Sequence, residues 1–116
     1  MEATLKQLKI QTSAVRRLLK EVAHYEKEAA GHETKLQGMK DEEADQYDIR
    51  AQERLLEESM MMIPDSKRRL EAAVVELREL VEAHQEDEAL AEKIAEARAV
   101  LPSEQEANPE ETGEGA

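Results

Sequence analysis

The stretch MMIPDSKRRLEAA, residues Met61–Ala73, decides the fold of this chain. It belongs to a longer pattern in which every seventh residue is aliphatic: Ile49, Leu56, Ile63, Leu70 and Leu77. Such residues lie along one side of an α-helix and must be covered by other helices. The pattern stays in phase on both sides of Pro64, although two separate helices would have no reason to share a phase. It therefore predicts one long helix over about residues 45–83.

Pro64 is predicted to bend this helix rather than to end it. A proline inside a helix removes a backbone hydrogen bond and clashes with the preceding turn, at a cost of about 3 kcal/mol. If the aliphatic row is heptad position a, Pro64 falls at b, on the outer side. A bend there curves the helix around its core. We expect Pro64 to set a structural kink.

The positions next to the aliphatic row are also largely apolar, which favours a helix that contacts two neighbours. These positions are e and g of the heptad and include Leu55, Met60, Met62, Val74 and Val81. Position d is less hydrophobic, because it holds Gln52, Ser59 and Ser66 before Ala73 and Leu80. The first half of this helix is therefore expected to pack closely or imperfectly.

Two further amphipathic helices are predicted, over about residues 4–39 and 87–101. The first has its apolar row at Leu5, Leu8, Thr12, Val15, Leu19, Val22, Tyr25, Ala29, His32, Leu36 and Met39. Two consecutive steps of three, at Leu19–Val22–Tyr25, shift the heptad phase by three residues. This helix should end near Gly38, before a polar turn closed by Asp45 as N-cap. Asp87 would cap the last helix, and Pro102 would end it.

The fold class that follows is all-α: an elongated, antiparallel three-helix bundle over residues 1–101, left-handed and coiled-coil-like, with a kinked middle helix. Because the third helix is the shortest, one end of the bundle is expected to contain only two helices. Residues 102–116 contain five Glu and no Lys or Arg. They are expected to form a disordered acidic tail.

Composition and charge exclude several classes of function. The net charge is −12, yet residues 1–40 hold eight basic against five acidic residues (+3), whereas residues 41–116 hold eight against twenty-three (−15). A nucleic-acid-binding protein needs a positive surface, so we expect no nucleic acid as partner. The chain has no Cys, and no run of about 18 apolar residues that would span a membrane. We expect a cytoplasmic protein without a membrane partner.

The sequence offers little for catalysis. His24, His32 and His84 form no HExxH motif or ligand cluster, so no metal site is expected. The DEEAD segment from Asp41 lacks the glycine of a calcium loop, and no glycine-rich phosphate loop is present. We expect no enzyme activity, no cofactor and no small-molecule substrate.

A protein-binding surface is the stronger expectation. The row farthest from the aliphatic side, heptad position f, reads Tyr47, Arg54, Met61, Arg68, Val75 and Glu82. Tyr, Arg and Met are enriched in protein interfaces. The outer row of the first helix contains Ile10 among basic residues. The candidate protein-binding residues are Arg17, Lys20, Tyr47, Arg54, Met61, Arg68 and Arg69.

Plainer interpretations stand beside this one. Met60 and Met62 flank the aliphatic row and are expected to fill irregular space where the kink disturbs packing. The pattern points Met61 outward instead. Arg68 and Arg69 are equally compatible with surface cations that pair with nearby glutamates.

Several motifs together resemble the tubulin-binding cofactor A family. They are IQTSAVRRLLKE (Ile10–Glu21), YEKEA (Tyr25–Ala29), YDI (Tyr47–Ile49), LLEESMMMIPDSKRRLEAA (Leu55–Ala73) and EARAVL (Glu96–Leu101). These motifs span most of residues 5–101 in the order and spacing of the family. The acidic tail and the turn from Asp41 do not share in the resemblance.

The resemblance implies a three-helix bundle with a proline-bent middle helix, and a chaperone rather than an enzyme. It implies capture of β-tubulin released by the cytosolic chaperonin, and its transfer to other tubulin-folding cofactors for pairing with α-tubulin. It also implies a cytoplasmic, cytoskeleton-associated location, without nucleotide or metal. The competing interpretation is a generic helical scaffold or adaptor that binds another acidic protein or self-associates.

Overall fold

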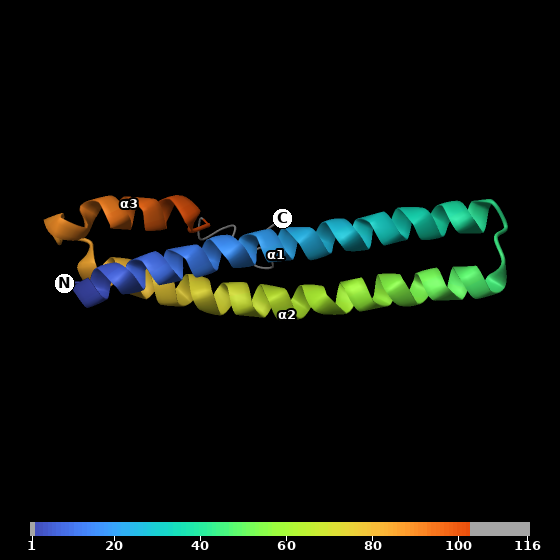
Figure 1. Ribbon diagram of the computed structural model, residues 1–116, viewed down its shortest axis with the longest axis horizontal. Coiled ribbons are helices and arrows are strands. Elements are labelled where there is room, and N and C mark those ends of the chain that lie inside the picture. The colour runs from blue at the N-terminus through green and yellow to red at the C-terminus, as the bar shows by residue number, and fades with distance from the viewer. Residues whose placement is uncertain (1, 103–116) are drawn as a thin grey trace, which may run out of the picture. The chain divides into compact units, whose positions relative to one another are not determined.

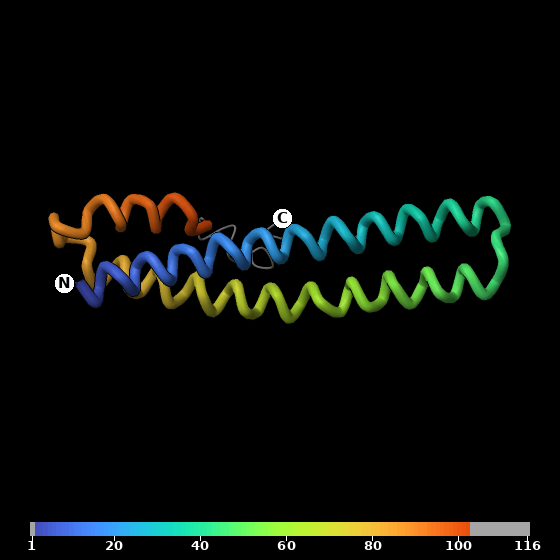
Figure 2. Tube along the Cα trace, in the orientation of Figure 1, coloured from blue at the N-terminus to red at the C-terminus, as the bar shows by residue number. Residues whose placement is uncertain are grey.

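The computed structural model describes residues 2–102, which are almost entirely helical. Helix α1 spans Glu2–Asp41, α2 spans Gln46–His84, a 3-10 turn η1 covers Glu88–Leu90, and α3 spans Ala91–Val100 (Figures 1 and 2). No strand occurs in this range. The all-α, three-helix class is confirmed. Apart from Pro102, the predicted acidic tail lies outside the described residues.

Helix α2 passes through Pro64 without interruption. The continuity that the sevenfold pattern predicted is therefore present, and a single helix carries the residues on both sides of the proline. Pro64 itself is exposed, as position b of the heptad requires. The bend at this residue stays a prediction.

The end of α1 lies beyond Gly38, the residue where the sequence placed it. Gly38 keeps a negative φ, so it continues the helix. The left-handed residue is Glu43, with φ of 56°. The amide of Ala44 donates to the Met39 carbonyl at 2.9 Å, and the amide of Glu43 donates to the Lys40 carbonyl at 3.1 Å. These two bonds form a Schellman motif, in which a non-glycine residue occupies the position that usually holds glycine.

The other helix ends follow the sequence closely. Asp45 caps α2, because its Oδ2 accepts a hydrogen bond of 3.0 Å from the amide of Tyr47. Asp87 caps η1 in the same way, accepting from the amide of Ala89 at 3.0 Å. The last predicted helix thus begins with a 3-10 turn before α3. Leu101 is extended, as expected for the residue before a proline.

The chain divides into two compact units. The three-helix unit comprises the described parts of Met1–Leu18 and Arg69–Ala116. It contains the start of α1, the end of α2, η1 and α3. Its core is a single cluster of aliphatic side chains from all of these elements: Leu8, Val15, Val74, Leu77, Val81, Leu90, Ile94 and Ala97. The guanidinium of Arg78 adds a hydrogen bond to the Pro102 carbonyl in this unit.

The helix-pair unit comprises Leu19–Arg68, that is, the end of α1, the turn and the start of α2. Its helices are antiparallel, since His32 pairs with Gln52 whereas Glu26 pairs with Lys67. Its buried side chains are fewer and smaller: Val22, Ala29, Leu36, Ile49, Gln52, Ser59 and Ser66. Position d, the weak row of the sequence, is therefore buried along this unit. Small side chains there permit close approach of the two helices.

Two expectations about apolar residues are wrong. Leu18 is buried instead of Leu19, so the consecutive steps of three fall at Thr12–Val15–Leu18. Met60 does not fill interior space, because 55% of its surface is exposed, and Met62 is 39% exposed. The physical reason is that the helix-pair unit has no third helix, so positions e and g of α2 are left uncovered there.

Candidate functional site

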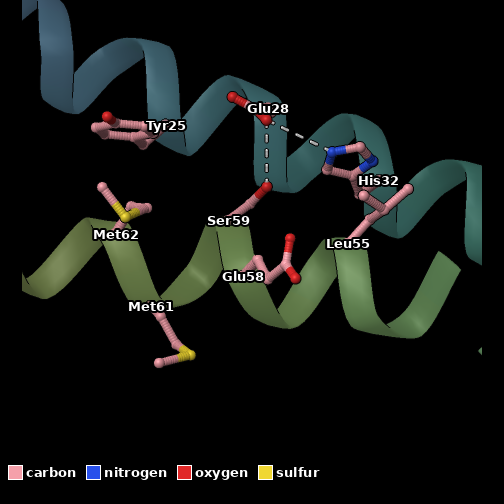
Figure 3. A pocket seen from close by; sticks show the side chains of 8 residues that line it. All are labelled: Tyr25, Glu28, His32, Leu55, Glu58, Ser59, Met61 and Met62. Carbon is pink, nitrogen blue, oxygen red and sulfur yellow. Dashed lines mark hydrogen bonds and ion pairs between the residues drawn. The ribbon is translucent and has the colours of Figure 1, made fainter. Parts of the chain in front are cut away.

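Four residues of the predicted outer row of α2, Tyr47, Arg54, Met61 and Arg68, lie on the surface of the helix-pair unit. Each member sits two residues from a buried seam residue, as Tyr47 does from Ile49, so it points roughly 160° away from the seam. Tyr47 is 80% exposed and Met61 73%, and Arg54 and Arg68 are exposed as well. Figure 3 shows the Met61 side chain pointing away from α1. The row therefore presents aromatic, thioether and guanidinium groups side by side along one helix.

The two neighbouring arginines already have interactions. Arg68 forms an ion pair with Asp65 at 3.6 Å, and the two side chains are 71% and 56% exposed. Such a solvated pair contributes little free energy, so the guanidinium can exchange it for a partner carboxylate. Arg69 is exposed and likewise interacts with another group.

The basic candidates on α1 occupy a different surface. Lys20 is exposed and lies two residues before the buried Val22. It therefore points away from α2, just as Met61 points away from α1. The helix-pair unit thus brings together Tyr47, Arg54, Met61 and Arg68, and it places Lys20 on the opposite side. Arg17 is exposed within the three-helix unit.

A groove on the flank of the helix pair was missed by the sequence analysis. It has a volume of about 440 Å³, which is room for a few side chains of a partner. Residues of both helices line it: Tyr25, Glu28, His32, Leu55, Glu58, Ser59, Met61 and Met62. Figure 3 shows Tyr25 of α1 and Met62 of α2 facing each other across it. One signal for this groove was available in the sequence. Tyr25 and His32 are seven residues apart, and so are Leu55 and Met62, so the two pairs can face each other across an antiparallel helix pair.

A connected set of polar side chains joins the two helices, and three of its members, Glu28, His32 and Ser59, line the groove. The Gln52 amide nitrogen donates to the His32 carbonyl at 3.1 Å and lies 3.2 Å from His32 Nδ1. The other ring nitrogen of His32, Nε2, lies 3.7 Å from a carboxylate oxygen of Glu28. Glu28 also accepts from the Ser59 hydroxyl at 3.5 Å and faces His24 Nε2 at 3.2 Å. These contacts fix the alignment of the two helices, while Tyr25, Leu55, Met61 and Met62 make much of the groove lining apolar.

This arrangement suits protein binding. Among residues 2–102, no group of His, Asp and Glu side chains could hold a metal ion. Over the same range, none of the helices combines the length and the apolar character needed to cross a membrane. What the surface offers is an exposed Tyr–Arg–Met row and an apolar groove beside it, and both are features of protein interfaces.

Comparison with known sequences agrees with the resemblance in the motifs. The tubulin binding cofactor A family model matches residues 3–101. Tubulin-specific chaperone A of Homo sapiens is 48% identical over 99 residues, which cover 85% of this chain and 91% of the relative. Tubulin-folding cofactor A of Arabidopsis thaliana is 44% identical over 97 residues, covering 83% and 86%.

Solved structures agree as well. The crystal structure of tubulin folding cofactor A from Arabidopsis thaliana superposes with a TM-score of 0.79 at 40% identity, covering 87% of this chain and 94% of that one. Human tubulin chaperone cofactor A gives a TM-score of 0.74 at 48% identity, covering 84% and 94%. The family match over nearly all described residues and the shared helical fold lead to one conclusion: this chain belongs to the tubulin binding cofactor A family.

Proposed function

We propose that this protein is a tubulin chaperone that captures β-tubulin released by the cytosolic chaperonin and holds it for assembly with α-tubulin. The names of its relatives support tubulin as the client. The observation that carries the proposal is the exposed row Tyr47–Arg54–Met61–Arg68 on α2, because Tyr, Arg and Met are enriched in protein interfaces, and Tyr and Arg are enriched in their hot spots. Other tubulin-folding cofactors would then receive the captured subunit, in the cytoplasm.

Electrostatics determine which surface would meet the client. β-Tubulin is acidic, and this chain carries a net charge of −12, so the net charges of the two proteins oppose their encounter. The basic side chains of the outer rows would instead steer and orient the encounter, and Tyr47 and Met61 would supply apolar contact. In this proposal Arg17 and Lys20 guide the approach from α1, while Arg54, Arg68 and Arg69 act from α2. The bend at Pro64 would shape the α2 surface.

Charge reversal of Arg68 and Arg69 tests the proposal. The double variant Arg68→Glu and Arg69→Glu should retain β-tubulin about tenfold less well than wild type, because like charges now oppose the encounter. A pull-down that quantifies β-tubulin retained without α-tubulin measures this. The matched control is Arg50→Glu with Arg98→Glu, which changes the net charge equally at two exposed positions outside the row. Equal retention by both double variants would remove the α2 row from the proposal.

A generic scaffold that self-associates is the alternative function. One observation favours it: among residues 2–102, six of the eight large exposed hydrophobic residues lie in the helix-pair unit, where a second copy could cover them. Sedimentation equilibrium at micromolar concentration distinguishes the two. A stable dimer without tubulin retention would support the alternative.

A further inference from the structure

The flank of α2 in the helix-pair unit is apolar without a covering helix. Leu55 is 44% exposed and Met62 39%, although both occupy position g, which in a bundle is partly covered. Seven residues separate them, so they follow each other along the helix at a distance of roughly 10 Å. Apolar side chains that recur at two-turn spacing on an open flank form one wall of a docking groove.

The opposite wall has matching spacing. Tyr25 and His32 are also seven residues apart, on α1, and the antiparallel arrangement sets Tyr25 against Met62 (Figure 3) and His32 near Leu55. Ser59 lies between them on the floor, where a larger seam residue would fill the space. The groove is therefore about two helical turns long. Helical segments that bind in such grooves insert apolar anchors spaced three, four or seven residues apart.

The charge of the groove selects its occupant further. Glu58 lines it, and its carboxylate has no hydrogen-bond or ion-pair partner among the described residues. Glu28 lines it as well, with 41% of its side chain exposed. No Lys or Arg is among the lining residues. A cationic side chain of a partner would therefore find the Glu58 carboxylate and, beside it, Glu28, which already contacts His24, His32 and Ser59.

We propose that this groove binds an amphipathic helical segment of the client protein that carries two apolar anchors and an arginine or lysine on the same face. The anchors contact Tyr25 with Met62 and His32 with Leu55, and the cation pairs with Glu58. This inference rests on the proposed function, because it takes tubulin as the client. The groove would be a second contact surface, acidic where the outer row is basic.

Two pairs of matched variants test the groove in the full-length protein. Met62→Gln and Glu58→Lys alter it, whereas Met60→Gln and Glu57→Lys make the same changes at exposed positions that do not line it. Retention of β-tubulin should fall about three- to tenfold for each groove variant, through lost apolar burial and reversed charge respectively. The controls should retain β-tubulin like wild type. Circular dichroism confirms equal helicity of all four variants.

A second arm uses a short helical peptide with two leucines seven residues apart, which matches the two-turn spacing of the groove, and an arginine on the same face. Its fluorescence anisotropy should report binding to wild type, weaker binding to the groove variants, and weaker binding of a peptide with glutamate for arginine. Peptide binding without β-tubulin retention would contradict the proposed function and support the groove. Retention that is unaffected by Met62→Gln and Glu58→Lys, or a change in self-association alone, would overturn the groove and leave the proposed function standing.

Discussion

Gln52, Ser59 and Ser66 of α2 are buried where a bundle helix usually places leucine. Each has a polar partner: Gln52 bonds to His32, Ser59 to Glu28, and Ser66 to another group. Satisfied polar groups cost little in the interior, but they forgo the roughly 1.5–3 kcal/mol that a buried leucine contributes. At the level of single residues, the helix-pair unit therefore gives up hydrophobic stabilisation for a specific pairing.

Gly31 lowers the stability of α1 without any packing reason. It has a helical backbone with negative φ, and a Cβ added to it would meet nothing within 4 Å. Gly31→Ala should therefore raise the free energy of unfolding by about 0.5–1 kcal/mol, because alanine loses less backbone entropy in a helix. Urea denaturation followed by circular dichroism measures the change. Ala30→Gly, on the neighbouring exposed turn, serves as the reverse control and should lower stability by a similar amount.

At the scale of the helices, the sequence predicted what depends on periodicity and capping. The sevenfold aliphatic row predicted that α2 continues through Pro64. Asp45 and Asp87 indicated where helices start, because their carboxylates can accept hydrogen bonds from backbone amides. The end of α1 was misplaced because Gly38 reads as a helix terminator. The signal that decided the end was the Schellman bonding around Glu43, which has no glycine to mark it in the sequence.

The choice between Leu18 and Leu19 as the buried residue shows a second limit of prediction from periodicity. Either leucine gives a row with one pair of consecutive three-residue steps, so periodicity alone does not distinguish them. The packing of the opposing helix decides, and it buries Leu18 in the three-helix unit. Adjacent apolar residues at such a phase shift can be resolved only when the partner surface is known.

Pro64 is the element-scale feature with a direct test. Pro64→Ala should raise the free energy of unfolding by up to about 3 kcal/mol, since alanine restores a backbone hydrogen bond and removes the ring clash. The melting temperature should rise accordingly. It should also straighten α2 and, if the bend shapes the client surface, weaken β-tubulin retention. Thermal denaturation and the same pull-down measure both effects. If the more stable variant retains β-tubulin as well as wild type does, the bend is not needed for capture.

For the whole molecule, the candidate surface was only partly predictable. The outer row of α2 followed from the sequence because position f is defined by one helix alone. The groove between Tyr25 and Met62 did not, since it depends on which residues of two antiparallel helices meet and on the lack of a third helix in that unit. The exposure of Met60 has the same origin. Features within one helix were thus accessible, and features of helix pairing were not.

The two units should differ in local stability. The three-helix unit has an aliphatic core from every one of its helical elements, whereas the helix-pair unit buries small and polar side chains and contains Gly31 and Gly38. Native-state hydrogen exchange should therefore proceed faster in residues 19–68 than in the cores of residues 8–18 and 74–97, because sub-global opening needs less free energy there. Mass spectrometry of peptic fragments resolves the units. Uniform protection across both would contradict the difference in core quality.

The bond from Gln52 to the His32 carbonyl also determines how the hairpin of α1 and α2 can misalign. Sliding one helix past the other by two turns would keep most apolar contacts of a repetitive seam, so hydrophobic burial alone tolerates such slippage. It would, however, leave the buried Gln52 amide without its hydrogen-bond acceptor, at a cost of about 1–3 kcal/mol. The polar seam therefore favours one alignment of the two helices of this unit over alignments shifted along the seam.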